Sequence, residues 1–382
     1  MVDRPRSRRA YLAALGSLGA SSLAGCSSVE AVVDTQLKKF DDRVQWSTKV
    51  HEPIDLHLAD GTLYVYTRDA IYALNAQSGN QIWETSLPKD DPDRACYYAP
   101  FTVTEDRIYL SGCKGMFAYS TDDGSQLWRR DDLDLFKRTL LIDGLLYCQT
   151  GHTLNVIDPE SGSTNRNHTL SDGPNTGLYG PTYRPADEMF YYVVDTAVRG
   201  DPDLVRAVDP STGEVEWDLE IPFSRTQTRP VVGDDFLYVV SGDARVDRIE
   251  ENRLFAVDPE LQELTWTAQS RAALDPPVVG RDHVFVASYG TDEAFLTAVD
   301  SREGTAAWSH RVTDRDGRLS RPRVGQSRVT VAIGGRQIHT RTIADGTEAE
   351  SFQLPMVQNV QPVQDGERLY VAAGTNVWAL DR

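Results

Sequence analysis

The sequence predicts an all-β protein, an eight-bladed β-propeller with four-stranded blades. Three observations carry this prediction. An Ala is followed ten residues later by a Trp five times, and a short β-branched and aromatic segment precedes each of eight copies of this motif. The eight copies recur with a mean period just under 44 residues, which is the spacing of a four-stranded propeller blade.

The composition is that of a globular protein and excludes several other classes. The chain has 382 residues, of which 40% are hydrophobic and 9% aromatic, so it can bury a large core. It has no apolar run as long as the roughly 18 residues that a membrane-spanning helix needs. The formal net charge of -18, without a concentrated basic segment, argues against a nucleic-acid partner.

The acidity has an unusual composition. Six lysines accompany 33 arginines, and 39 of the 57 acidic residues are Asp. This bias resembles the proteins of salt-loving archaea, in which short, hydrated carboxylates keep the protein soluble when salt screens charge repulsion. We therefore interpret most acidic stretches as solvated surface.

Residues 1–25 are predicted to form an export signal. The segment from Ser7 to Leu12, with Arg8 and Arg9, resembles a twin-arginine export motif, and a mild apolar stretch too short to span a bilayer follows it. The sequence Leu-Ala-Gly-Cys ending at Cys26 resembles a lipoprotein box, in which the chain is cut before Cys26 and the thiol is lipidated. A plain cleaved signal, or a chance arginine pair, is the alternative.

The expected domain organisation follows from this signal. Residues 1–25 form the twin-arginine lipoprotein signal peptide, residues 26–43 a lipid-anchored tether, and residues 44–382 the propeller. The protein is then extracytoplasmic and held on the outer face of the cell membrane through the lipid on Cys26.

The repeat motif defines the third and fourth strands of each blade. An Asp, or a substitute, lies two residues after the Ala and a Gly usually lies six residues after it, as in the segment 207–217. The five clear copies begin at Ala73, Ala118, Ala207, Ala256 and Ala298, with Trp83, Trp128, Trp217, Trp266 and Trp308 ten residues on. Weaker copies begin at Val156, Thr340 and Ala379.

A β-branched and aromatic segment ahead of each copy predicts the second strand of the blade. Leu63-Tyr64-Val65 and Leu237-Tyr238-Val239 are examples, and most follow a Gly or Asp turn. The repeating unit is therefore strand, turn, strand, loop, strand, Asp-x-x-x-Gly turn and strand, with alternating apolar and polar residues. We expect no long helix to interrupt it.

The two ends of the chain are predicted to share the last blade. The final copy stops at Arg382, three residues after Ala379, so it lacks a fourth strand. A spare strand around Trp46 precedes the first complete repeat, and pairing it with the C-terminal strands closes the ring and removes exposed sheet edges. Seven blades is the alternative, because the copy at 330–350 has lost both Ala and Trp.

The turn pattern A-x-D-x-x-T-G-x-x-x-W is similar to that of the quinoprotein-like (PQQ-like) β-propeller repeat, over roughly residues 44–382. The resemblance implies that the tryptophans dock against neighbouring blades; these are Trp46, Trp83, Trp128, Trp217, Trp266 and Trp308. The family has two main branches. One contains dehydrogenases that carry pyrroloquinoline quinone (PQQ) with calcium, and the other contains non-catalytic lipoproteins of the BamB type. Fold alone does not choose between them.

The residues favour the non-catalytic branch. Alcohol-oxidising members of the other branch carry adjacent cysteines over the quinone, whereas Cys26, Cys96, Cys113 and Cys148 are nowhere adjacent. The histidines show no paired-ligand spacing, and no phosphate-binding loop is present. We expect a binding or assembly scaffold without catalytic residues, metal or cofactor, acting with envelope protein partners or an unknown ligand. A PQQ- and calcium-dependent dehydrogenase is the alternative.

Two sites of covalent modification are candidates. If residues 104–107 form a hairpin turn, Cys96 and Cys113 lie nearly opposite each other, and either a disulfide or two buried thiols fits this placement. Asn167-His168-Thr169 is a glycosylation sequon.

The candidate binding residues lie in loops that are enlarged in three consecutive copies. These loops, at 196–203, 242–252 and 290–294, are equivalent, so we expect them on the same face of the ring, where they form one wall. Surface insertions without function are the alternative. The candidate residues are Arg199, Asp201, Asp203, Asp243, Arg245, Asp247, Arg248, Arg253, Asp292 and Glu293.

Overall fold

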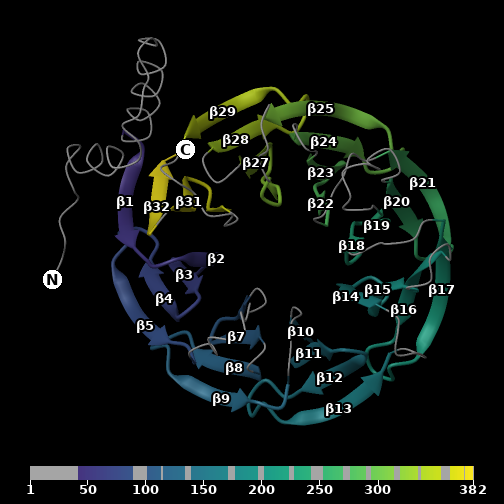
Figure 1. Ribbon diagram of the computed structural model, residues 1–382, viewed down its shortest axis with the longest axis horizontal. Coiled ribbons are helices and arrows are strands. Elements are labelled where there is room, and N and C mark those ends of the chain that lie inside the picture. Colours follow the sequence, from purple (N-terminus) through teal and green to yellow (C-terminus); the bar gives the residue numbers. More distant parts are fainter. Residues whose placement is uncertain are drawn as a thin grey trace, which may run out of the picture.

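The computed structural model describes residues 42–88, 101–112, 115–133, 139–170, 177–196, 202–222, 228–241, 253–269, 276–289, 294–313, 319–333, 337–353, 362–373 and 375–381. These residues form 32 strands in eight four-stranded antiparallel sheets, arranged as a closed ring (Figure 1). The prediction of an eight-bladed propeller is confirmed. The described part of the chain contains no helix that could cross a membrane.

The first four blades follow one another along the chain. Blade 1 consists of β2 (Pro53–Ala59), β3 (Thr62–Thr67), β4 (Ala70–Asn75) and β5 (Gln81–Ser86). Blade 2 consists of β6 (Thr102–Val103), β7 (Arg107–Gly112), β8 (Gly115–Ser120) and β9 (Gln126–Arg130). Blade 3 consists of β10 (Leu140–Ile142), β11 (Leu145–Thr150), β12 (Thr153–Ile157) and β13 (Thr164–Thr169). Blade 4 consists of β14 (Gly177–Arg184), β15 (Met189–Asp195), β16 (Asp203–Val208) and β17 (Val215–Ile221).

The second half continues in the same order until the last blade. Blade 5 consists of β18 (Val231–Val232), β19 (Leu237–Ser241), β20 (Arg253–Asp258) and β21 (Glu263–Gln269). Blade 6 consists of β22 (Val278–Val279), β23 (His283–Tyr289), β24 (Ala294–Asp300) and β25 (Ala306–Thr313). Blade 7 consists of β26 (Arg323–Val324), β27 (Arg328–Ile333), β28 (Gln337–Thr342) and β29 (Glu348–Gln353). Blade 8 consists of β30 (Val363–Gln364), β31 (Arg368–Ala373), β32 (Asn376–Asp381) and, from the other end of the chain, β1 (Val44–Lys49).

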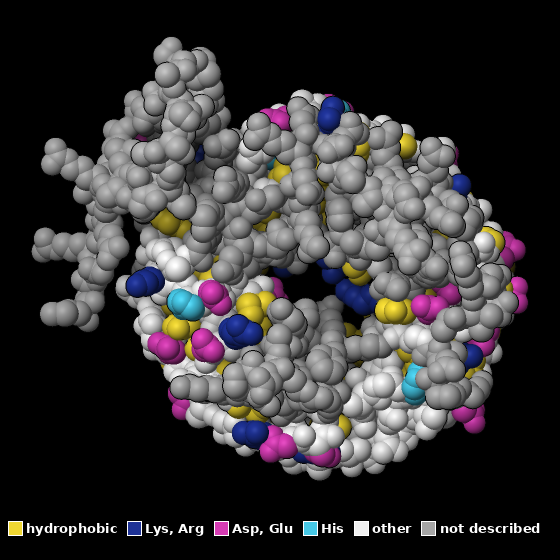
Figure 2. All heavy atoms as spheres, viewed as in Figure 1, with side chains coloured by type: hydrophobic (Ala, Val, Ile, Leu, Met, Phe, Trp, Pro, Cys, Tyr) yellow, Lys and Arg dark blue, Asp and Glu magenta, His cyan; other side chains and the backbone are white. Residues whose placement is uncertain are grey.

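In each blade the first strand is innermost and the fourth lies on the rim (Figure 1). The free edge of each inner strand borders the central opening of the ring, which is visible in the space-filling view (Figure 2). A proline directly precedes the inner strand in blades 5 to 8, at Pro230, Pro277, Pro322 and Pro362. Proline lacks the amide donor that a paired strand needs, so it suits an edge strand and discourages further pairing there.

The hydrophobic core is divided into layers between neighbouring blades. On β3, Leu63 and Val65 pack in a cluster with residues of blade 8, whereas Tyr64 packs with Trp83 and residues of blade 2. This is the alternation of a strand whose two faces are both covered. Each blade therefore depends on both neighbours to bury its apolar side chains.

The turn between the third and fourth strands explains the Asp and Gly of the repeat. In blade 6 the Asp300 carboxylate accepts hydrogen bonds from the amides of Arg302 (2.9 Å) and Glu303 (2.8 Å), which hold the pKa of Asp300 below its usual value. Gly304 closes the turn with a φ of +70°, a conformation that favours glycine. In blade 1 Asn75 replaces the Asp and accepts from the amides of Gln77 and Ser78.

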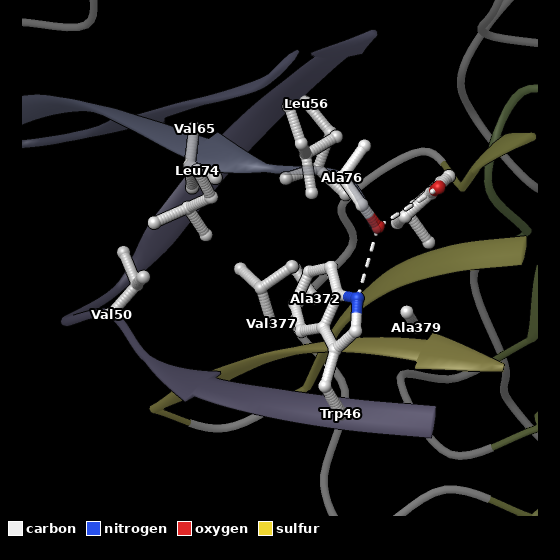
Figure 3. Packing of buried hydrophobic residues seen from close by; sticks show 11 residues of the cluster. Trp46, Val50, Leu56, Val65, Leu74, Ala76, Ala372, Val377 and Ala379 are labelled. Atoms are coloured by element: carbon white, nitrogen blue, oxygen red, sulfur yellow. Dashed lines mark hydrogen bonds between the residues drawn. The ribbon is translucent and has the colours of Figure 1, made fainter. Parts of the chain in front are cut away.

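A tryptophan of the preceding blade packs directly against the same glycine, which has no side chain to keep the ring away. A Cβ atom on Gly79 would lie 2.5 Å from the Trp46 ring, and one on Gly304 would lie 2.5 Å from Trp266. The indole N–H of these tryptophans donates to a carbonyl of the same turn. The bonds are Trp46 to Ala76 O (3.0 Å, Figure 3), Trp83 to Thr121 O (2.8 Å), Trp128 to Pro159 O (2.8 Å), Trp266 to Ser301 O (3.2 Å) and Trp308 to Ile343 O (2.9 Å).

The ring closes between the two ends of the chain, as predicted. Strand β1 pairs antiparallel with β32, and Trp46 lies opposite Ala379. Trp46 is 8% exposed, and Figure 3 shows its ring among side chains of blade 1, such as Leu56, and of blade 8, such as Val377. The N-terminal strand thus supplies both the fourth strand and the docking tryptophan of blade 8.

Blade 7 forms although its copy of the repeat has lost Ala and Trp, and this decides against seven blades. Thr330 and Thr340 replace the aromatic residue and the Ala, and their buried hydroxyls lie 3.0 Å apart. Glu350 lies opposite Thr340, where six of the other seven blades have Trp, and forms an ion pair with Arg43. Since the third and fourth strands of blade 8 come from opposite chain ends, no Asp-x-x-x-Gly turn joins them, and an ion pair replaces the tryptophan contact.

Replacing Trp46 by Ala should lower the free energy of unfolding by about 3–5 kcal/mol, because the substitution leaves a cavity and removes a bond to blade 1. Trp217 is the matched control: it is only half-buried, since Gln262 stands where the neighbouring turn would have Gly. Trp217→Ala should therefore cost less. Denaturant titration of both variants measures the difference, and equal losses would contradict a special role for closure.

Replacing Asp300 by Ala should cost about 1 kcal/mol at pH 7, whereas Asp300→Asn should be nearly neutral, because Asn75 holds the equivalent turn in blade 1. The folded pKa of Asp300 is lowered, so its contribution is present above the unfolded value of about 4 and is lost as the pH falls through the folded value. Unfolding titrations at several pH values should show less acid sensitivity in Asp300→Asn than in wild type. Equal acid sensitivity would contradict this account.

Candidate binding site

The connection between the second and third strands is enlarged in blades 4, 5 and 6. It comprises residues 196–202, 242–252 and 290–293 in these blades, against 68–69, 113–114, 151–152, 334–336 and 374–375 in the others. Because all strands are antiparallel, these connections leave every blade at the same face of the ring, which we call the loop face. The turns between first and second and between third and fourth strands lie on the opposite, hairpin face.

Most of the predicted loop residues lie outside the described part of the chain; these are Arg199, Asp201, Asp243, Arg245, Asp247, Arg248, Asp292 and Glu293. Two are placed. Arg253 is the first residue of β20 and is half-buried beside Ser241. Asp203 was expected in an exposed loop, but it is the first residue of β16, and its side chain is fully buried. It therefore belongs to the blade and not to the exposed wall.

The N-terminal chain enters the ring at the hairpin face. Val44, at the start of β1, pairs with Leu380 near the end of β32, and the Asp381 amide donates to the Arg43 carbonyl (2.9 Å). The end of a third strand is where the other blades have their turn to the fourth strand. The start of β1 therefore lies on the face opposite to the one at which the enlarged connections leave their blades.

The seam between blades 3 and 4 has no tryptophan: the His168 side chain of β13 lies against Gly213 of the blade 4 turn, and an arginine of blade 4 adds a hydrogen bond across the seam. Arg166 stands opposite Val156, at the tryptophan position of blade 3. In blade 4 the Arg206 guanidinium donates to both oxygens of Asp218 (2.8 Å each) and to the Leu170 carbonyl of blade 3 (2.9 Å). Arg206 is 7% exposed, and the bidentate pair satisfies its charge.

Sequence reasoning missed Arg206 and also the arginines beside the inner strands, Arg229, Arg321 and Arg323. The sequence nevertheless carries a feature that could have identified Arg206 and another that could have identified the arginines of the inner strands. Arg206 interrupts the apolar segment 204–208 of the third strand of blade 4, and the segments Arg229-Pro230 and Arg321-Pro322-Arg323 place charge at the start of inner strands.

The remaining sequence candidates are distributed as follows. Asn167 is exposed on the outermost strand β13 of blade 3. Cys148 is a free, fully buried thiol, and burial raises its pKa to about 12. Arg8, Arg9, Cys26, Cys96 and Cys113 lie outside the described residues. Among the residues that are described, no group of three or more His, Cys, Asp or Glu side chains could hold a metal ion.

Eight four-stranded blades, joined through tryptophans that contact the glycine turn of the next blade, define an eight-bladed propeller of the quinoprotein-like class. The family model for outer membrane protein assembly factor BamB matches residues 29–186 and 201–381. The chain belongs to this family.

Individual relatives are more distant. BamB of Escherichia coli (strain K12) is 33% identical over 135 residues, which span 30% of this chain but only 34% of that protein. BamB of Salmonella typhimurium is 23% identical over an alignment that covers 96% of this chain and 98% of that protein. These relatives are assembly factors of the outer membrane by their names.

Solved structures agree on the fold. The crystal structure of BamB from Moraxella catarrhalis has a TM-score of 0.68 at 14% identity and covers 89% of this chain and 99% of its own. A europium-containing methanol dehydrogenase has a TM-score of 0.66 at 11% identity and covers 89% of this chain and 93% of its own. At these identities the likeness concerns the fold alone, so it favours neither branch of the class.

Proposed function

We propose that this protein is an exported, lipid-anchored scaffold without catalytic activity, which binds envelope protein partners through its loop face. The observation that carries the proposal is the enlargement of one equivalent connection in three consecutive blades. Adjacent blades bring these connections together on one face, and binding residues commonly lie on loops that a rigid framework positions. Membership of the BamB family supports a role in assembling other proteins.

The blades that carry the enlarged connections form a rigid framework, which suits a protein that binds partners without catalysing a reaction. Blades 4 and 5 are joined to their neighbours by buried contacts, including the hydrogen bond from Arg206 of blade 4 to the Leu170 carbonyl of blade 3, so the bases of the enlarged connections are held in fixed positions. The dehydrogenase alternative would require a quinone and calcium, and the fold likeness to a methanol dehydrogenase does not bear on that chemistry.

The proposed location rests on the N-terminal segment. Arg8 and Arg9 match a twin-arginine signal, and Cys26 follows a lipoprotein box. The tether of residues 26–43 spans at most about 65 Å when extended, at roughly 3.3–3.6 Å per residue. It joins the ring at the hairpin face, opposite to the face at which the enlarged connections leave the blades. The abundance of Asp over Lys fits an environment of high salt.

Replacing residues 245–251 by a Gly/Ser segment of equal length should abolish partner capture while leaving the fold intact, because these residues lie within the largest of the three connections. The matched control changes Glu260 and Leu261, both exposed on the hairpin face of the same blade, to Ser. Cross-linking in intact membranes followed by mass spectrometry measures the partners. Recovery of the same partners by the loop variant would contradict the proposal, as would their loss in the control alone.

The anchor has its own test. Cys26→Ser should move the protein from the membrane fraction to the medium, because the thiol that carries the lipid is removed. Cys148→Ser is the control: it changes a buried thiol of β11 and should leave the protein in the membrane fraction. Cell fractionation and the mass of the purified N-terminal peptide measure the outcome. A Cys26→Ser protein that stays in the membrane would overturn the lipid anchor.

A further inference from the structure

One asparagine of the chain stands in a glycosylation sequon. The chain has nine asparagines, and Asn167 alone is followed two residues later by Ser or Thr, in the segment Asn167-His168-Thr169. An asparagine in this pattern is the acceptor of N-linked glycans when the middle residue is not proline. An enzyme can use such a sequon in a folded protein only where the asparagine is accessible, so the place of Asn167 in the fold decides its use.

Asn167 lies on the outer wall of the ring. It belongs to β13, the last strand of the blade 3 sheet, which among the described strands pairs on one side only, with β12 (Figure 1). Every residue of β13 is exposed except His168, which is half-buried. The neighbouring strand differs, because Asn155 of β12 lies opposite Asn167 and is only 6% exposed. The change from buried to exposed therefore falls between these two strands, and Asn167 is on the exposed side.

The missing tryptophan of blade 3 explains this exposure. In β5 and β9 the Trp opposite the motif Ala is buried, whereas Arg166 stands at that position in β13 and is exposed. His168 lies against Gly213 of blade 4. Because side chains alternate between the two faces of a strand, Asn167 and Thr169 share the face that points away from blade 4. The two residues that define the sequon are thus exposed together on one face.

We propose that Asn167 carries an N-linked glycan, attached outside the cell membrane, an inference that rests on the export included in the proposed function. In the attachment, Asn167 Nδ2 forms a bond to the anomeric carbon of a glycan that is carried on a lipid phosphate. The bond between that carbon and the phosphate oxygen breaks, the lipid phosphate leaves with the electron pair, and a base of the transferring enzyme takes one amide proton. Since Asn167 is exposed in the folded propeller, the blade does not have to open for this step.

A glycan at this position would also protect a sheet edge. An outermost strand presents unpaired N–H and C=O groups, to which a strand of another chain can pair, and proteins commonly block such edges. A bulky, hydrophilic group in the middle of β13 would keep a second strand from aligning there. Blade 3 carries none of the three enlarged connections, so the glycan is separate from the loop contacts of the proposed function.

Mass spectrometry of the peptide that contains residue 167 tests the site, on full-length protein purified from the cells that produce it. We expect this peptide to exceed its sequence mass by a whole number of sugar residues, with the added mass on Asn167. Asn167→Gln and Thr169→Ala should each remove the added mass completely, because the first lacks the acceptor amide and the second lacks the hydroxyl of the sequon.

Two variants serve as matched controls. Thr169→Ser keeps a hydroxyl at the same position and should retain the glycan. Asn165→Gln changes an exposed asparagine of the same strand that stands outside a sequon, and it should retain the glycan as well. A glycan that persists in Thr169→Ala would overturn the assignment, because the sequon would then not be the recognised feature.

The same cells separate this inference from the proposed function, because protease added to intact cells reports whether the protein is exported. Exported wild-type protein with an unmodified Asn167 would overturn the glycan and leave the proposed location intact. Protein that is protected inside the cell and unmodified would overturn the proposed location and the glycan together.

Discussion

The structure depends on one contact, which recurs at five of the eight seams: an indole of one blade against the glycine turn of the next. A four-stranded sheet of this size covers neither of its faces, so its apolar side chains need the two neighbouring blades. The Asp of the turn binds backbone amides, the Gly at positive φ brings the backbone close, and the Trp fills that space and donates to a carbonyl. The Asp, the Gly and the Trp that recur in the repeat therefore all act at the contact between neighbouring blades.

Closure follows from the same constraint. An open row of blades would leave one apolar face and its seam contacts uncovered at each end, and the N-terminal strand removes both ends at once. Because the two chain ends share blade 8, no turn joins its third and fourth strands. This affects the seam between blades 7 and 8. Glu350 and Arg43 occupy that place with an ion pair, and the hydroxyls of Thr330 and Thr340 replace the aromatic packing within blade 7.

The sequence pattern predicted the features that recur from blade to blade. It missed the features that depend on contacts between segments distant in the chain. The blade count and the partner of the Trp46 strand could be derived, because the repeat carries its own spacing and the last copy lacked a strand. Blade 7 was ambiguous because its substitutions make sense only beside Arg43, which is distant in sequence. Asp203 was assigned to a loop because chain spacing does not show that β16 already begins there. Arg206 was missed because a one-dimensional period does not show that its side chain reaches the Leu170 carbonyl of the neighbouring blade.

The same geometry separates three surfaces on one ring. The seams are fixed by packing, so variation is tolerated where strands are connected on the loop face, and there blades 4 to 6 differ from the rest. The N-terminal chain joins at the opposite face, through β1. The inner strands of blades 5 to 8 are two residues long, and each follows a proline, which disfavours further pairing at the inner edge. A propeller can therefore receive its N-terminal chain at one face and leave the variation of its strand connections to the other.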